Sequence, residues 1–457
     1  MNKKDYENYI NLALSTGADF AEVFYEESEN NILRLNDSKL DTIDSNNSKG
    51  LGIRITKGDE SYYTSTNNMD KCNVERIIKN ILKNIPQESG KNISLNSLED
   101  KTIKVKIPHN EYPMDKKKDL LYKIDEVARS YSNLVTQVST GIVETDKTFI
   151  IANSNGKYVK GNSSLTRIIT TVYAERDGEK QQEFTDFAGG VGYELLDEFN
   201  VEEVINKTAK IAVEKLDAID FKGGELPVVI APGFGAVIFH EACGHGLEAT
   251  SVAPHLSVFS DDLNKKIATD KVTLIDDGTI PSAWGSFIID DEGNESQKNI
   301  LIEKGILKKY LVDQFNSKEM HMKSNGCGRR QNYRYATTSR MSNTYLAPGN
   351  DKVEDMIKSI DLGVYCEKMS GGSVNPATGD FNFAVDTARL IEKGKVTKLL
   401  KGITLIGNSK DILKNVEMIS DDLVISAGYC GSKSGTIPVT IGQPTIKVSK
   451  ILVGGKE

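Results

Sequence analysis

The segment FGAVIFHEACGHGLEAT, residues 234–250, is the most informative stretch of this sequence. It follows a short apolar strand pattern, and Pro232 is suitably placed to open a helix. The helix is apolar on nearly every side and is therefore expected to be buried, yet it carries His240, Glu241 and His245. Uncompensated polar groups in an apolar setting cost roughly 2–7 kcal/mol each. Something must satisfy these side chains, and a metal ion does so directly.

The two histidines are five residues apart, whereas the HExxH zinc signature places them four apart with the glutamate as general base. In an ideal helix this spacing would rotate the second imidazole by about 140° from the first. A π-bulge, with one residue inserted into the turn, would return both rings to one face. Gly244 and Gly246 flank His245 and would lower the strain of such a distortion. The pattern predicts a metal-binding helix with a local π turn.

Other interpretations of this segment remain open at the level of the residues. Two histidines in a buried helix can be hydrogen-bonded core residues, although the adjacent carboxylate favours a metal. A catalytic zinc takes three protein ligands and leaves a fourth position for water, so a third ligand must come from elsewhere. Spacing alone selects none of the remaining candidates, which are His109, His255, His321 and Cys430. Cys243 is a competing ligand on the helix itself, although a small buried thiol usually packs in a core.

Composition limits the class of protein. The 457 residues suit two large domains or three small ones, and 38% hydrophobic and 27% charged residues are typical of a soluble globular chain. A net charge of −8, with both signs interspersed, argues against a nucleic-acid partner. No run approaches the roughly 20 apolar residues of a membrane span, and residues 1–16 lack the apolar stretch of a signal peptide. The sequence predicts a cytoplasmic protein.

The cysteines agree with that location. Five scattered cysteines form no CxxC pair, so a disulfide framework is not expected. Cys72, Cys327 and Cys366 are interpreted as structural residues.

Periodicity predicts an α+β fold. Helical patterns over residues 6–14 and 74–85 enclose strand-like stretches at 21–25, 32–35 and 51–55, and a similar order follows with helices near 115–131 and 201–216 around strands within 136–187. We therefore expect an N-terminal α/β domain of helix-sheet-helix units over residues 1–220, which suggests a duplicated unit. Short β-branched runs at 272–275, 286–289, 306–312 and 423–425 predict a β-rich C-terminal domain over residues 221–457 that carries the metal-binding helix.

Three segments carry a resemblance to a known family. They read HEACGHGLEAT from His240, GRRQNYRYATTSRMSNTYLAPG over residues 328–349, and GYCGSKSGTIPVTIGQPTIKV from Gly428. Near the N-terminus, GADFAEVFYEES and GLGIRITKGDESYYTSTN extend the match. In these segments and over essentially its whole length the chain resembles the TldD/PmbA metallopeptidases.

The resemblance implies an HExxxH zinc site, with one zinc per chain and endo- or exopeptidase activity. In it, His240, His245 and Cys430 are the metal ligands and Glu241 is the catalytic base. Because the motif is intact, the chain resembles the catalytic, TldD-like type of subunit.

The resemblance also implies partners. Members form homodimers, or heterodimers with a motif-deficient TldE/PmbA-like subunit, around a cavity that holds unfolded peptide or protein in extended form. Such binding would use backbone hydrogen bonds to a strand edge.

Two alternatives to a peptidase remain. The chain could be a peptide-binding or scaffold subunit that needs a partner for activity, or a structural zinc protein, which would supply four protein ligands. A further set of residues is interpreted either as groups that position substrate and stabilise an oxyanion or as structural ion pairs and interface residues. This set is Arg329, Arg330, Tyr333, Arg334 and Arg340.

Overall fold

The computed structural model describes residues 1–455 and confirms an α+β chain. The N-terminal half is one long curved sheet, with strand order β3-β2-β1-β5-β6 and with β7 and β4 both paired to β6. Its strands are β1 Phe20–Asn36, β2 Lys39–Lys57, β3 Glu60–Thr66, β4 Glu99–Asp100, β5 Val135–Asn153, β6 Tyr158–Arg176 and β7 Glu179–Gly189.

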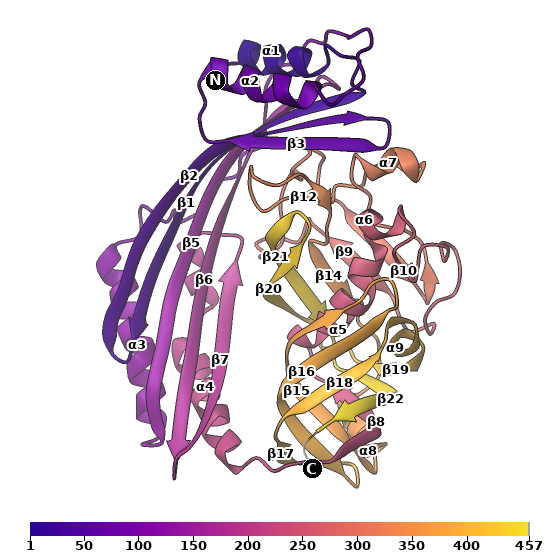
Figure 1. Cartoon of the computed structure of the whole chain (residues 1–457). Coiled ribbons are helices and arrows are strands. Elements are labelled where there is room, and N and C mark those ends of the chain that lie inside the picture. The colour runs from indigo at the N-terminus through magenta and orange to yellow at the C-terminus, as the bar shows by residue number, and fades with distance from the viewer. Residues whose placement is uncertain (456–457) are drawn as a thin grey trace.

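Helices cover this sheet at two places. Helices α1 (Lys3–Ala13) and α2 (Lys71–Leu82) pack together at one end, whereas α3 (Met114–Tyr131) and α4 (Val201–Glu214) lie along one side of the other end, as Figure 1 shows. The short 3₁₀ turns η1 (Tyr193–Glu198) and η2 (Lys215–Asp217) flank α4. Helices α1 and α2 pack one apolar cluster against the sheet, and helices α3 and α4 pack a second one.

The order of helix, three long strands and helix occurs twice, and β1 and β5 lie next to each other where the two sets of strands meet. The stretches predicted as separate strands at 21–25 and 32–35 are one strand, because the polar residues between them pair with both β2 and β5. Among them, Glu26 is buried beside Lys147, 3.4 Å away. The predicted division into domains over residues 1–220 and 221–457 stays a prediction.

The C-terminal half contains two larger sheets. One has the order β11-β10-β9-β14-β21-β20, and the other has β15-β8-β22-β18-β16-β17 with β19 paired to β22. The strands are β8 Gly223–Ile230, β9 Leu274–Asp277, β10 Lys298–Glu303, β11 Ile306–Leu307, β14 Asn343–Leu346, β15 Leu362–Val374, β16 Asp380–Glu392, β17 Lys395–Leu400, β18 Ile403–Asn408, β19 Val416–Ile419, β20 Val424–Ser432, β21 Gly435–Gln443 and β22 Ile446–Gly454.

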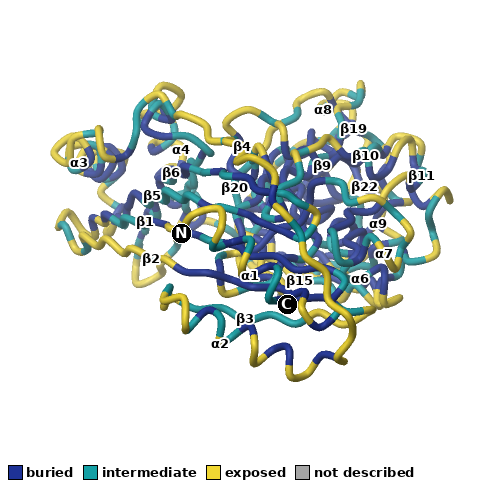
Figure 2. The backbone as a smooth tube through the Cα atoms, turned by 90° about the horizontal axis from the view of Figure 1, so that it is seen from above, coloured by how far each residue is buried: buried dark blue, intermediate teal, exposed yellow. Residues whose placement is uncertain are grey.

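A small ribbon and three short helices complete this half. They are β12 Gly328–Arg329 paired with β13 Thr338–Ser339, α7 Asn316–Glu319, α8 Val353–Lys358 and α9 Ser409–Asn415. The two sheets enclose the largest apolar cluster of the chain, which includes most of the predicted metal-binding helix. Figure 2 shows this buried backbone beside the largely exposed outer loops near α2 and α3.

Two predicted strands are wrong in extent. Residues 286–289 form only a single bridge, between Ile289 and Glu295, because the amides of Ser286 and Phe287 bond to nearby loop carbonyls instead of a ladder. The stretch 306–312 is a strand only in β11, since Leu311 turns aside to exchange backbone hydrogen bonds with residues 247 and 249 at the end of the predicted metal-binding helix.

Buried ion pairs join the two halves of the chain. Arg54 of β2 lies 2.7 Å from Glu292, and Arg330 lies 2.5 Å from Glu22 of β1, with all four side chains almost fully buried. The Arg330 guanidinium also stacks over Phe24, 4.2 Å from the ring centroid. These contacts hold the N-terminal sheet against the C-terminal half. None of the helices within residues 1–455 combines the length and apolar character required to cross a bilayer.

Candidate metal centre

The predicted π turn is confirmed. The buried segment runs through η3 (Phe234–Ala236), α5 (Val237–Phe239), the π-helical turn η4 (His240–Gly244), the 3₁₀ turn η5 (His245–Leu247) and α6 (Ala249–Val252). The wider π turn brings both imidazoles to one side, with ring centroids 5.2 Å apart and planes at 84°.

Gly244 at the end of the π turn and Gly246 in η5 are required by packing, and neither has a positive φ. Gly244 has ordinary helical angles, φ −53° and ψ −54°. A Cβ atom there would lie 2.0 Å from Sδ of Met341, and one on Gly246 would lie 2.8 Å from a ring carbon of Phe259. The sequence analysis expected these glycines to relieve backbone strain. The structure shows instead that neighbouring side chains approach too closely for a Cβ atom.

Cys430 reaches the histidines from β20, where it pairs with Ile437 of β21. Its Sγ lies 3.2 Å from Nε2 of His245. The candidate ligand atoms of His240, His245 and Cys430 all lie within 4.8 Å of one another, the one such group found among residues 1–455. Nδ1 of His240 is buried without a hydrogen-bond partner. Two imidazoles and a thiolate form a donor set that suits zinc, so these residues fit a bound metal.

The electrostatics of the group favour a thiolate. Burial acts to raise the pKa of Cys430, but the neighbouring His240 and His245 hold it well below its usual value. Burial acts to lower the pKa of His245, whereas Glu248 and Cys430 raise it well above the ordinary range. The thiolate is the form of cysteine that binds metals, so the histidines prepare Cys430 for that role.

Glu241 is the accessible member of the cluster. Its carboxylate lies 3.8 Å from Nε2 of His245, and its side chain is 21% exposed. His240 and Cys430 are each only 3% exposed. Glu241 can therefore meet a water molecule or a ligand from the open side of the group.

Glu248 is a site residue that the sequence analysis did not single out. Its buried carboxylate accepts a hydrogen bond from Nδ1 of His245 at 3.0 Å. A carboxylate three residues after a candidate ligand histidine, in the segment HGLEAT, is the signal that would have identified it.

The other cysteines and histidines lie outside this group. Cys243, Cys327 and Cys366 are buried, and burial raises the pKa of the Cys243 thiol, as expected for a core residue. Cys72 is exposed on α2. His109 is held by Asp146 and Thr166, each at 2.8 Å.

The second anchor segment is mainly structural. Arg329, Arg330 and Arg340 are buried and bond to backbone carbonyls or carboxylates. Tyr333 is also buried, in a cluster with Phe24, whereas Arg334 is exposed. These contacts favour the interpretation as structural ion pairs and packing.

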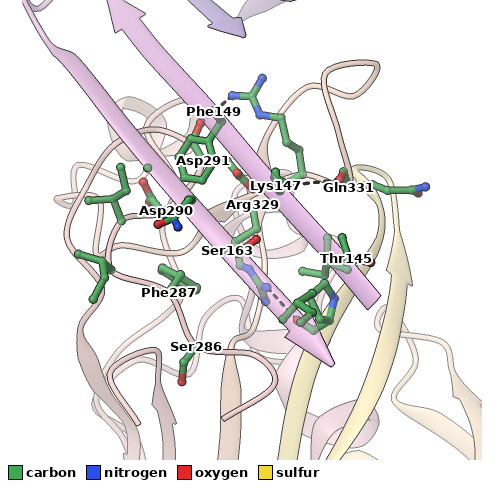
Figure 3. Close-up of a pocket in the computed structure, with 18 of the residues that line it drawn as sticks. Thr145, Lys147, Phe149, Ser163, Ser286, Phe287, Asp290, Asp291, Arg329 and Gln331 are labelled. Atoms are coloured by element: carbon green, nitrogen blue, oxygen red, sulfur yellow. Dashed lines mark hydrogen bonds between the residues drawn. The ribbon is translucent and has the colours of Figure 1, made fainter. Parts of the chain in front are cut away.

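A cavity of about 210 Å³ lies between the N-terminal sheet and the hairpin that carries Cys430. Figure 3 shows Thr145, Lys147 and Phe149 of β5 facing it together with Phe287 and Arg329 of the C-terminal half. The next residue to Cys430, Tyr429, and Pro438 of β21 also line it. The cavity and the candidate metal group therefore share the β20–β21 hairpin, although none of the three candidate ligands lines the cavity.

Family models cover most of the chain. Models of PmbA/TldA metallopeptidases match domain 1 at residues 21–85, the central domain at 107–216 and the C-terminal domain at 223–455.

Individual relatives agree with these matches. A protein named Metalloprotease TldD homolog from Buchnera aphidicola is 32% identical over 452 residues, covering 96% of this chain and 93% of that protein. One named Zinc metalloprotease TldD homolog from Saccharolobus solfataricus is 28% identical and covers 98% and 99% of the two chains. The crystal structure of TldE from Thermococcus kodakarensis has the same fold, with a TM-score of 0.78 at 20% identity over 99% of this chain and 100% of that one. The chain belongs to the TldD/PmbA family of metallopeptidases.

Proposed function

We propose that this chain is a zinc-dependent peptidase, with one zinc held by His240, His245 and Cys430 and with Glu241 as the general base. The observation that carries the proposal is the convergence of three candidate ligand atoms within 4.8 Å, drawn from a π turn and a distant hairpin. The name of the Saccharolobus relative supports zinc as the metal. Three protein ligands leave a position open for chemistry, whereas a structural zinc usually has four.

When bound, zinc would act as a Lewis acid that polarises the scissile carbonyl and favours ionisation of water. Glu241 lies beside His245 and is partly exposed, so its carboxylate can accept the proton of the attacking water. The same carboxyl then delivers this proton to the leaving amine. His240 and Cys430, which are buried, exclude bulk water from the inner side of the group.

The substrate that fits this site is an extended peptide segment of an unfolded protein. Among the described strands, β20 pairs only with β21 and β7 pairs only with β6, so each has a free edge. Both strands line a cavity of about 570 Å³, through residues 186–188 and 425–427. A peptide that hydrogen-bonds to the edge of β20 would run towards Cys430, with affinity from backbone contacts more than from side chains.

The assembly is also part of the proposal. We infer a cytoplasmic dimer, either of two like chains or with a motif-deficient TldE-like partner, that encloses the peptide. The fold similarity to TldE supports the second form.

The test compares wild type with Glu241→Gln, which retains size and hydrogen bonding but cannot accept a proton. Metal is measured by elemental analysis, and hydrolysis with an unfolded casein substrate, with and without chelator. We expect about one zinc per chain in both proteins and chelator-sensitive cleavage in wild type alone. Normal cleavage by E241Q would exclude Glu241 as the base. Wild type that binds zinc and cleaves nothing, alone or with a TldE-like subunit, would refute the peptidase.

A further inference from the structure

The carboxylate of Glu248 accepts two hydrogen bonds beside the candidate metal ligands. One oxygen, Oε2, accepts from Nδ1 of His245 at 3.0 Å, and the other, Oε1, accepts from the backbone amide of Met341 at 3.3 Å. The side chain is 3% exposed, and the backbone of Glu248 pairs with that of Leu311. Because Nδ1 faces this carboxylate, Nε2, which lies 3.2 Å from Sγ of Cys430, is the ring nitrogen that remains to bind a metal.

Arg340 forms hydrogen bonds to the hairpin that carries Cys430. One guanidinium nitrogen, Nη2, donates to the carbonyl oxygen of Cys430 at 2.5 Å, and Nη1 donates at 2.9 Å to both the Ser434 hydroxyl and the Gly435 carbonyl. Its Nε lies 3.9 Å from Oε1 of Glu248, an ion pair without a hydrogen bond. The side chain is completely buried. Arg340 therefore hydrogen-bonds to the backbone of one candidate ligand and is ion-paired with the carboxylate that orients another.

We propose that Glu248 and Arg340 are positioning residues that hold His245 and Cys430 in register for the metal. The two candidate ligands are 185 residues apart in sequence and lie on elements that do not pair with each other. Glu248 follows His245 in the chain, and Arg340 binds the turn between β20 and β21. Among the described residues, the ion pair between Glu248 and Arg340 is the only one that connects these two parts of the site. This inference deepens the proposed function and rests on it for the identity of the ligands.

The chemistry of the two groups explains why they are a carboxylate and a guanidinium. A carboxylate accepts at both oxygens, whereas glutamine presents one acceptor and one donor, so E248Q would set an NH₂ group against either the Nδ1 proton or the Met341 amide. The planar guanidinium reaches three acceptors at fixed angles, which a lysine ammonium cannot do. Changes to groups that orient metal-ligating histidines typically cost about 10–100-fold in metal affinity.

The experiment measures the zinc dissociation constant of the full chain by competition with a chromophoric chelator, for wild type, E248Q and R340K. Arg330→Lys is the matched control, because Arg330 is a buried arginine of the same segment that donates to Glu22 and to the carbonyl of Asp291, away from Cys430 and Glu248. Thermal unfolding of the metal-free proteins shows whether each variant folds. In the cobalt-substituted proteins, the thiolate-to-metal charge-transfer absorption reports the bond to Cys430.

We expect E248Q and R340K to bind zinc about 10–100-fold more weakly than wild type, and R340K to lose charge-transfer intensity. R330K should bind zinc as wild type does, even where its unfolding temperature falls as far as that of R340K. Equal losses of affinity in R340K and R330K would show a general packing defect and overturn the inference. So would wild-type affinity in E248Q and R340K.

The absence of peptidase activity and the absence of positioning roles give different experimental results. If wild type binds zinc but cleaves no peptide, the peptidase is refuted, whereas the affinity comparison still decides the positioning roles. If wild type cleaves and the two variants match it in zinc affinity, only the positioning roles are refuted.

Discussion

Replacing Gly244 with alanine tests whether packing shapes the π turn. The backbone at Gly244 is helical, so alanine is sterically allowed there and should gain about 0.5–1 kcal/mol in conformational entropy. Its Cβ, however, would lie 2.0 Å from Sδ and 2.8 Å from Cε of Met341. Met341 is fully buried, and its amide and carbonyl are held by Glu248 and Arg329, so only rotation of its side chain within the core can relieve the overlap.

The magnitude follows from these two opposed effects. Overpacking a well-filled core costs about 1–3 kcal/mol. The overlap is with Sδ and Cε, the far end of a flexible but fully buried side chain, so a cost near the middle of that range is expected. Subtracting the entropy gain leaves a net loss of about 1 kcal/mol in unfolding free energy. Because the π turn begins at His240 and His245 follows it directly, the same displacement should weaken zinc binding.

The assay is urea unfolding of the metal-free protein together with zinc competition. Gly431→Ala is the control, because it lies next to Cys430 and its Cβ meets nothing closer than 3.8 Å. The double variant G244A/M341A should be less destabilised than the sum of the two single changes, with a coupling of about 0.5–3 kcal/mol. If G244A were as stable as wild type, or if the two changes added, packing against Met341 would not be the reason for glycine at this position.

Three other changes have expected outcomes. Cys430→Ser should lose zinc and Cys243→Ser should keep it, measured by elemental analysis, and the reverse result would make Cys243 the ligand. Glu22→Ala should lower the unfolding free energy by about 3–5 kcal/mol, because it leaves the buried guanidinium of Arg330 without this carboxylate. Urea unfolding measures the loss, and a shift of the midpoint worth less than about 1 kcal/mol would contradict this prediction. Chelator should lower the thermal midpoint of wild type but not of H240A, since only a folded site that binds metal gains stability from it, and equal shifts would place the metal elsewhere.

Local patterns in the sequence were sufficient to predict part of this structure. The stripe of Tyr6, Tyr9 and Ile10 predicts the buried face of α1, and the five-residue spacing of the histidines predicts the π turn. Both signals depend on a few consecutive turns of chain. Long strands were harder to predict, because the polar residues in the middle of β1 resemble a turn until β2 and β5 supply partners on both sides.

Residues that depend on distant partners could not be predicted from pattern. No spacing rule connects Cys430 to His245, and the family resemblance alone pointed to that cysteine. Arg54 and Glu292 are 238 residues apart, so their buried ion pair leaves no trace in local composition. Glu248 is the exception, since its place three residues after His245 was visible in the sequence.

The way in which the metal group is built indicates what holds it together. The histidines and the thiol come from segments that are ordered by folding of the whole C-terminal half, so the entropy of bringing them together is lost before any metal arrives. Preorganised ligands of this kind bind metal tightly, and here the three candidate ligand atoms lie within 4.8 Å of one another. Two imidazoles and a thiol gathered in a core are costly where only apolar packing is needed. Their convergence, together with the histidines that lower the pKa of the thiol, is the strongest physical argument that the group binds a metal.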